Sequence, residues 1–167
     1  DGATVGGEFH VNTSISDDQT QPVVAALNDG GFVIAWASRE GSDYNIIGQR
    51  YNSAGGAVGG EFRVNNYLSS DQQSAAVTAL ADGGFVITWS SYGQANDGFA
   101  IYGRRYDVDG VAQGNEFRIS GDGESQEFSS ITALSDGGFL VTWSGLNLSD
   151  GEDPDYNIYA RRYDSAG

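Results

Sequence analysis

One short stretch of sequence occurs three times in this chain and constrains the fold more than any other feature. Its middle copy, from Val77 to Ser90, reads VTALADGGFVITWS, and the other two copies begin at Val24 and Ile131. In each copy an Asp-Gly-Gly triplet separates two runs of β-branched and aromatic residues. Because glycine readily adopts the positive φ that a tight turn needs, the triplet predicts a β-hairpin. Three copies of one hairpin predict a repeat protein.

The spacing of the copies divides the chain into three repeats within a single domain. Aligned residues lie 53 to 57 positions apart: Phe9, Phe62 and Phe117; Gly30, Gly83 and Gly137; Trp36, Trp89 and Trp143; Tyr51, Tyr106 and Tyr163. We place the repeats at about 1–55, 56–110 and 111–167. The 25 glycines and two prolines among 167 residues favour many short strands joined by turns over helices. The sequence therefore predicts an all-β fold.

Each repeat is predicted to contain four strands. In the first repeat they are residues 7–12, 22–27, 32–38 and 45–52. The counterparts are residues 60–65, 75–80, 85–91 and 100–107 in the second repeat, and 115–120, 129–134, 139–144 and 157–164 in the third. The third strand is apolar on both faces, because Phe85, Ile87 and Trp89 alternate with Val86 and Thr88. A four-stranded unit covered on both faces is typical of a β-propeller blade.

The order of the strands predicts how the blades are completed. The first segment of each repeat is predicted to form the outermost strand of the preceding blade, so the chain would end on a blade without its fourth strand. Three blades are fewer than a propeller typically needs. We therefore expect two chains to form a homodimer by strand exchange, each N-terminal strand completing the other chain's last blade in a six-bladed ring. A β-trefoil, which would be monomeric, is the alternative, and a three-sheet prism is a further one.

Two resemblances rest on these motifs. The order of apolar strand, Asp-Gly turn, strand ending near Trp and strand ending in Arg-Arg-Tyr-Asp resembles the blades of Trp-Asp repeat propellers, without the Trp-Asp pair. More closely, Ser135–Ser144, Ile158–Asp164 and Gly59–Asn65 are similar to tandem repeats in large secreted bacterial proteins of the RTX, haemolysin-type calcium-binding kind. This resemblance implies a bacterial protein that is secreted or lies at the cell surface, such as an adhesin. The Gly-Gly-x-Gly-x-Asp calcium repeat of that family is absent here.

The predicted connections place most acidic side chains on one face of the propeller. Thirteen of the 23 acidic residues fall in two sets of loops, 13–21, 66–74 and 121–128, and 39–44, 92–99 and 145–156. Ca²⁺ binds oxygen ligands of this kind on glycine-bearing loops. The densest candidate ligands are Asp122, Glu124, Asp150, Glu152, Asp153 and Asp155. Calcium is therefore a candidate cofactor, and a merely solvated acidic surface is the alternative.

Aromatic residues beside these acids are candidates for binding a carbohydrate, because aromatic rings pack well against sugars and carboxylates accept hydrogen bonds from hydroxyl groups. The candidate ligand-binding residues are Asp43, Tyr44, Tyr92, Asp97, Phe99, Asp155 and Tyr156. Packing within the hairpins is the alternative for the aromatic members. Trp36, Trp89 and Trp143 could also stack on sugars, but they end apolar strands, which favours a structural core role.

All eight basic residues are arginines. Six residues form the pairs Gln49-Arg50, Arg104-Arg105 and Arg161-Arg162 on the fourth predicted strand of each repeat. We expect one arginine in each blade to form an ion pair with Glu8, Glu61 or Glu116 on the adjacent outer strand. Recognition of an anion or a sugar is the alternative.

Charge and motifs exclude several classes of function. A net charge of −15 makes nucleic acid an improbable partner, because binding phosphates needs a basic patch. The chain has no cysteine, its one histidine, His10, has no partner by motif, and no catalytic or membrane-spanning motif is present. We expect a non-catalytic binding or adhesion module that binds a glycan or another surface ligand through its acidic loops. The alternatives are a purely structural propeller spacer and an excised or engineered fragment that self-assembles.

Overall fold

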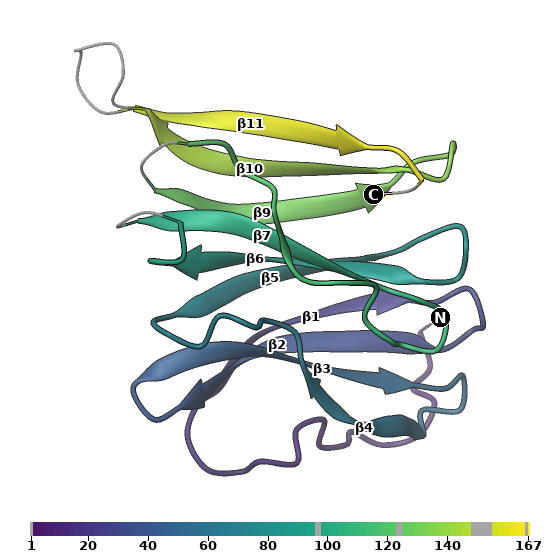
Figure 1. Cartoon of the computed structure of the whole chain (residues 1–167). Coiled ribbons are helices and arrows are strands. Elements are labelled where there is room, and N and C mark those ends of the chain that lie inside the picture. Colours follow the sequence, from purple (N-terminus) through teal and green to yellow (C-terminus); the bar gives the residue numbers. More distant parts are fainter. Residues whose placement is uncertain (1, 96–97, 123–124, 148–154, 166) are drawn as a thin grey trace.

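The computed structural model describes residues 2–95, 98–122, 125–147, 155–165 and 167, and these residues form eleven strands. Figure 1 shows the strands in three sheets that stack on one another. The first sheet consists of β1 (Gln19–Ala26), β2 (Phe32–Glu40), β3 (Asp43–Tyr51) and β4 (Ala57–Arg63). The second consists of β5 (Gln72–Ala79), β6 (Phe85–Tyr92), β7 (Phe99–Tyr106) and β8 (Phe117–Arg118). The third consists of β9 (Gln126–Ala133), β10 (Phe139–Asn147) and β11 (Asp155–Tyr163).

Each sheet is an antiparallel meander with the order of a propeller blade. The strand orders are β1-β2-β3-β4, β5-β6-β7-β8 and β9-β10-β11, so within the described residues the third sheet has no fourth strand. The first strands of neighbouring sheets contact one another, β1 with β5 and β5 with β9. This arrangement confirms the predicted all-β fold of propeller-type blades. The trefoil alternative, in which strands from all repeats join one barrel, is wrong. In the described part of the chain, no helix could cross a membrane.

The first strand of each blade begins three residues earlier than predicted, at Gln19, Gln72 and Gln126. A β-bulge interrupts the pairing of each of these strands with its neighbour. The residues at the bulges have φ values between 54° and 57°, namely Gln21, Ser74 and Phe128. A bulge adds one residue to a strand, so the alternation of apolar side chains is broken there. This break hides the first part of the strand from pattern analysis.

The Asp-Gly-Gly hairpin predicted from the sequence is confirmed, with the same geometry in all three blades. In the second blade the Leu80 N–H donates to the Gly84 carbonyl at 2.8 Å, and the Gly84 N–H donates to Asp82 Oδ1 at 3.0 Å. Gly83 has a φ of +92°, which favours glycine. A Cβ on Gly84 would lie 2.3 Å from the Tyr106 carbonyl oxygen. The two glycines are therefore required for different reasons, the first for its φ and the second for a close backbone approach.

The central strand of each blade supplies the core between the sheets. In β6, all five residues from Phe85 to Trp89 are fully buried, so both faces of this strand are covered as predicted. Each tryptophan indole N–H donates to the glutamine that begins the first strand of its blade. These bonds join Trp36 to Gln19 at 2.8 Å, Trp89 to Gln72 at 3.1 Å and Trp143 to Gln126 at 2.7 Å. With exposed fractions of 4%, 0% and 5%, the three tryptophans lie in the core and present no face to a ligand.

The fourth strand links its own blade to the next one. Phe62 in β4 covers Gly48 of its own sheet, where a Cβ would lie 2.6 Å from Phe62 Cζ. The Phe62 ring also packs on Tyr106 of the second sheet, with 5.2 Å between ring centroids. Phe117 in β8 packs in the same way on Tyr163 of the third sheet, at 5.7 Å. The outer segments of the second and third repeats thus belong to the preceding sheet, as the strand order predicted.

The N-terminal segment differs from the prediction, because residues 7–12 are not a strand in the single chain. They lie against the first sheet instead, with the Phe9 ring 5.5 Å from that of Tyr51. The Tyr51 hydroxyl donates to the Val11 carbonyl at 3.2 Å. A strand is defined by its ladder of backbone hydrogen bonds, and this segment has no neighbouring strand on which to form one.

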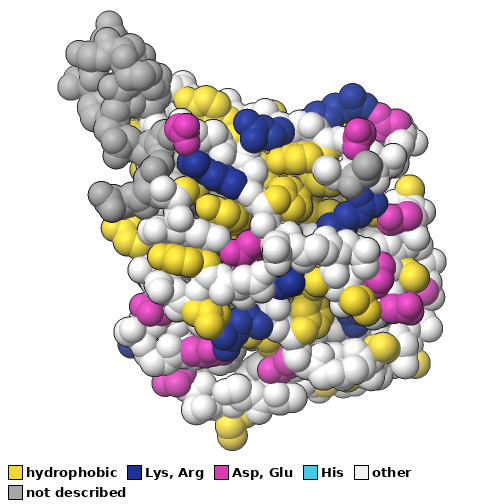
Figure 2. Space-filling model, viewed as in Figure 1, with side chains coloured by type: hydrophobic (Ala, Val, Ile, Leu, Met, Phe, Trp, Pro, Cys, Tyr) yellow, Lys and Arg dark blue, Asp and Glu magenta, His cyan; other side chains and the backbone are white. Residues whose placement is uncertain are grey.

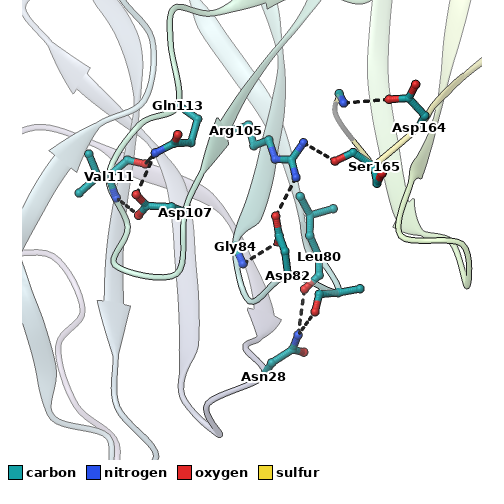
Figure 3. A network of polar contacts seen from close by, with 12 residues as sticks. Asn28, Leu80, Asp82, Gly84, Arg105, Asp107, Val111, Gln113, Asp164 and Ser165 are labelled. Carbon is teal, nitrogen blue, oxygen red and sulfur yellow. Dashed lines mark hydrogen bonds and ion pairs between the residues drawn. The ribbon is translucent and has the colours of Figure 1, made fainter.

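The predicted ion pairs of arginines with the outer-strand glutamates Glu61 and Glu116 are wrong, while the one with Glu8 stays a prediction for a completed third blade. The second residue of each pair instead binds the Asp of the hairpin turn, as Arg50 with Asp29, Arg105 with Asp82 and Arg162 with Asp136. The physical reason is the hairpin register, which places Tyr106, next to Arg105, opposite Phe85 at the turn. Figure 3 shows that Arg105 also donates to the Ser165 carbonyl, at 2.8 Å, and so joins the second blade to the third. The outer-strand glutamates Glu61 and Glu116 accept backbone N–H groups.

Asp82→Asn should remove a pH-dependent contribution to stability. Partial burial raises the pKa of the Asp82 carboxyl, but hydrogen bonds from Arg105 and from the Gly84 N–H outweigh burial and hold this pKa below its ordinary value of 3.8. Because the folded chain favours the carboxylate, the contribution is present above pH 3.8 and is lost as the pH falls through the lowered pKa. We expect the variant to unfold at a lower urea concentration than the original chain at pH 7.

The difference between the two proteins should be smaller at about pH 2.5 than at pH 7, because the contribution of the carboxylate is lost progressively as the pH falls through its lowered pKa. Asp109→Asn, at an exposed turn residue, is the control and should leave urea unfolding unchanged at both pH values. A gap between Asp82→Asn and the original chain that stays the same at low pH would contradict this assignment.

Candidate functional site

The loop face is the end of the three sheets opposite the Asp-Gly-Gly turns, and its described residues are 13–18, 39–44, 64–71, 92–95, 98–99, 119–122, 125, 147 and 155–156. In every blade one backbone hydrogen bond of 2.9 Å joins the loop that precedes the first strand to the end of the second strand. These bonds run from Arg39 N–H to the Asp18 carbonyl, from Tyr92 N–H to Asp71 and from Leu146 N–H to Ser125. The two sets of loops predicted to share one face therefore do so.

In the first blade the candidate residues Asp43 and Tyr44 are half-buried. The Tyr44 hydroxyl donates to the Asp18 carboxylate at 3.5 Å, and its backbone N–H donates to Asp71 Oδ1 at 3.0 Å. Asp18 also forms a 3.7 Å ion pair with Arg39. Because Tyr44 is hydrogen-bonded to Asp18 and Asp71 and is half-buried, the loop of this blade exposes little aromatic surface to a ligand.

The second blade presents an aromatic pair. The rings of Tyr92 and Phe99 meet edge to face at 5.1 Å, and 42% of Tyr92 is exposed. The Tyr67 hydroxyl donates to the Gly93 carbonyl at 3.3 Å and anchors the start of this hairpin. Leu68, in the neighbouring loop, is 54% exposed. The pair therefore forms an accessible apolar surface on a hydrogen-bonded support. Asp97, also a candidate, lies outside the described residues.

The third blade exposes its aromatic candidate most. Tyr156 is 61% exposed, and Asp155 beside it is exposed as well. Within the described residues, no hydrogen bond or ion pair joins the candidate residues of one blade to those of another. The candidates thus form three separate surfaces along the loop face, one on each blade.

The candidate metal ligands are only partly described. Asp122 forms a 2.9 Å ion pair with Arg118, which occupies one of its carboxylate oxygens. Glu124, Asp150, Glu152 and Asp153 lie outside the described residues. Among the residues that are described, no three acidic or histidine side chains come together in a group that could hold a metal ion.

Two residues that the sequence analysis did not single out organise the loop face. Asp18 and Asp71 each precede the glutamine that binds the tryptophan of its blade, and Asp71 joins the first blade to the second through Tyr44. Their shared position in the repeat was the available signal. The third repeat has Ser125 at this position, so the pattern is incomplete in the sequence.

Two hollows lie away from the loop face. One of about 340 Å³ lies between the second and third sheets near the hairpin turns, beside Asp82, Arg105 and Phe117. The other, of about 270 Å³, lies beneath the N-terminal segment, beside Phe9 and Trp36. The ion pair between Asp82 and Arg105 already engages the charged groups of the first hollow. Figure 2 shows one face of the molecule, on which apolar side chains are exposed over the upper sheet, β9–β11, with arginines among them.

Comparison with solved structures finds relatives of this fold at low sequence identity. A protein of unknown function from Dyadobacter fermentans superposes with a TM-score of 0.56 and 11% identity, over 86% of this chain and 51% of that chain. An endo-arabinase from Bacteroides thetaiotaomicron has a TM-score of 0.53 and 16% identity, over 89% and 58%. An N-acetylgalactosamine deacetylase from F. plautii, in complex with blood group B trisaccharide, has a TM-score of 0.51 and 16% identity, over 89% and 50%.

The chain spans about half the length of these structures. At 11% to 16% identity the likeness concerns the fold, and the structures with this fold include proteins that act on glycans. No protein-family model matches the chain, and no curated protein matches it.

Proposed function

We propose that this chain is a non-catalytic binding module that takes a carbohydrate at its loop face. The observation that carries the proposal is a contrast between the two ends of the blades. The hairpin turns repeat the same residues and the same hydrogen bonds three times, whereas the sequence between the strands that end at the loop face differs in length. It has two residues between β2 and β3, six between β6 and β7, and seven between β10 and β11. A constant scaffold that carries differing loops is a common arrangement for binding sites.

The chemistry of the exposed side chains supports a sugar ligand. Tyr92 and Tyr156 present partly free rings, and a flat ring packs against the apolar face of a pyranose. Carboxylates beside them can accept hydrogen bonds from sugar hydroxyl groups. Calcium belongs to the proposal as an ion that would bridge loop carboxylates and sugar hydroxyls. The glycan-acting proteins among the structural relatives are compatible with such a ligand.

The proposal includes a secreted or surface-attached bacterial protein as the setting of this module, where binding of a surface glycan would serve adhesion. The resemblance of the sequence to repeats of RTX-type proteins supports this setting. The rival proposal is a structural spacer whose loop face binds nothing specific. The ties of Tyr44 to Asp18 and Asp71 favour the spacer for the first blade, because they use the polar groups there for internal support.

A glycan array probed with the 167-residue chain, once with calcium and once with EDTA, separates the two proposals. We expect binding to a defined group of glycans, weakened about tenfold or more by Tyr92→Ala or Tyr156→Ala, since each removes a stacking ring. Val58→Ala, at a 43% exposed residue of β4 outside the loop face, is the control and should bind like the original chain. No binding in either condition would favour the spacer, and binding that both tyrosine variants retain would contradict the proposed site at these two rings.

A further inference from the structure

The outer edge of the third blade is open, whereas the equivalent edge of each of the other two blades is covered by a fourth strand. Ile158, in the middle of β11, is 77% exposed, whereas its counterparts Ile46 in β3 and Ile101 in β7 are fully buried. Along β11 every residue but the last is exposed, while β3 is buried over most of its length. The difference arises because, among the described residues, no strand pairs with the outer edge of β11. An unpaired strand edge with exposed apolar side chains is a surface on which another strand can dock.

The covered blades show which groups fill the equivalent edge. In the first blade the Val64 N–H donates to the Ile46 carbonyl, and the Ile46 N–H donates to Asn65 Oδ1, both at 2.8 Å. In the second blade the residues that follow β8 make the same two bonds to Ile101, at 2.7 and 3.0 Å. The docking strand therefore supplies an aliphatic residue and, directly after it, a side-chain acceptor.

The N-terminal segment, residues 8–13, has the sequence that this edge requires. Residues 8–12 read EFHVN, against EFRVN at 61–65 and EFRIS at 116–120. The segment also lies where an outer strand lies relative to the next sheet, with Phe9 against Tyr51 at 5.5 Å. The Thr13 N–H at the end of this segment donates to the Glu61 carboxylate. In the same way the Asn66 N–H, which follows β4, donates to the Glu116 carboxylate. The segment is thus positioned as the fourth strand of a blade that precedes the first sheet.

This segment and the open edge lie at opposite ends of the stack. Figure 1 shows β11 at the top of the stack and the N-terminal segment beneath the first sheet, with the second sheet between them. Phe9 and Tyr51 anchor the segment to the first sheet, so it cannot also reach β11 of its own chain. A second molecule carries the matching segment in the matching orientation.

We propose that residues 8–13 of a second copy of this chain pair with β11 and complete the third blade, and that two copies do so reciprocally. The result is a closed six-bladed ring with two-fold symmetry. The register follows from the second blade, where Arg118 faces Tyr102 and Phe117 faces Gly103. It places His10 of one copy opposite Tyr159 of the other.

An asparagine pair supports the match between the two edges. In the first blade the Asn65 side-chain amide donates to Asn45 Oδ1 at 2.7 Å. The second blade has neither asparagine, with serine and alanine at the two positions. The proposed contact again combines two asparagines, Asn12 and Asn157, in the pattern of the first blade. In the single chain Asn12 Nδ2 donates to the Ser14 carbonyl at 2.7 Å, as Asn65 Nδ2 does to the Tyr67 carbonyl at 2.8 Å.

One position requires an adjustment at the interface. The third blade has Ala160 where the other blades have Gly48 and Gly103, and a Cβ at Gly48 would lie 2.6 Å from the Phe62 ring. At Gly103 the nearest atom would be Cδ1 of Ile119, at 2.8 Å. The N-terminal segment has the shorter Val11 at the Ile119 position, which removes that contact, and the far end of the Phe9 ring has to move aside.

The mass of the chain in solution tests the proposal first. Each chain carries a net charge of −15, so the measurement belongs at about 0.15 M salt, where repulsion between copies is screened. We expect light scattering to give twice the 17.6 kDa of one chain. Ile158→Asp, at a residue exposed in the single chain, should leave the circular dichroism spectrum unchanged and weaken dimerisation at least about 30-fold. Val111→Asp, at a residue that is 59% exposed and directly follows a turn, should remain a dimer.

A cysteine pair tests the register, because the chain has no cysteine of its own. The double variant His10→Cys/Tyr159→Cys should form a disulfide-linked dimer on mild oxidation, while His10→Cys/Val111→Cys should not. A chain that keeps a single-chain mass at every concentration, an open-ended ladder of copies, or cross-linking that is equal in both double variants would overturn the proposal. None of these results depends on whether a glycan binds.

Discussion

Replacing Trp89 by alanine should cost about 3–5 kcal/mol of unfolding free energy, the largest loss expected from any single tryptophan of the chain. Its indole is fully buried in the middle blade, with sheets on both sides, and stacks on Tyr102 at 6.4 Å. Removing the indole loses buried apolar contacts and leaves a cavity, which the sheets on either side cannot fill without moving apart from their other contacts. Urea unfolding followed by circular dichroism measures this loss.

A double-mutant cycle separates the hydrogen bond from the packing. Trp89→Phe leaves the buried Gln72 side chain without its donor, and Gln72→Leu leaves the indole N–H without its acceptor. Each single change should therefore include the cost, about 1–3 kcal/mol, of an unpaired buried polar group. The double variant removes both groups, so its loss should be smaller than the sum of the two by about 1 kcal/mol or more. Losses that simply add would mean that this bond contributes nothing specific.

Gly84→Ala should be nearly as damaging, at about 3 kcal/mol or more, although it adds a single methyl group. The new Cβ would lie 2.3 Å from the backbone carbonyl oxygen of Tyr106. A side chain could relieve such a contact by changing its rotamer, but the backbone of a paired strand cannot. Gly31 and Gly138 face the same oxygen of their own blades at 2.3 and 2.2 Å, so alanine there should have similar effects. The midpoint of urea unfolding is the measurement.

Two other glycine substitutions serve as controls for the steric argument. Gly83→Ala would bring its Cβ only against the Val108 side chain, at 3.3 Å, but it would lose the residue that favours a φ of +92°, and it should cost about 1 kcal/mol. Gly60→Ala, where an added Cβ meets nothing within 4 Å, should change stability by less than about 0.5 kcal/mol. Equal losses at Gly83 and Gly84 would contradict the distinction between a φ requirement and a close approach.

Much of the fold follows from the sequence because each blade repeats the same local signals. The Asp-Gly-Gly turn and the two apolar faces of the strand from Phe85 to Trp89 set the hairpin and its burial. The first three residues of β1, β5 and β9 were not predicted as strand, since the bulges at Gln21, Ser74 and Phe128 break the alternation of apolar side chains. The ion pairs were not predicted for another reason. A sequence gives no distances between residues far apart in the chain. Asp82 reaches Arg105 only because the pairing of β6 with β7 brings the turn close to the end of β7.

The candidate site was predictable in its location but not in its detail. The strand order was sufficient to place the two sets of loops on one face, as the bond from Tyr92 N–H to the Asp71 carbonyl illustrates. It could not distinguish the tied Tyr44 from the exposed Tyr156, because that difference depends on which side chains of the neighbouring blade lie nearby. The strand order also could not predict the ion pair between Asp122 and Arg118.

Hydrogen exchange at the Ile158 amide, followed by NMR, tests most directly whether all three repeats are blades completed in the same way. Its counterparts at Ile46 and Ile101 each donate to a side-chain acceptor that follows an outer strand. In the original chain the Ile158 amide should exchange as slowly as those two, and Asn12→Ala should speed its exchange while leaving theirs unchanged. Fast exchange at Ile158 in the original chain, with Ile46 and Ile101 protected, would show a bare edge in solution and contradict the shared ring.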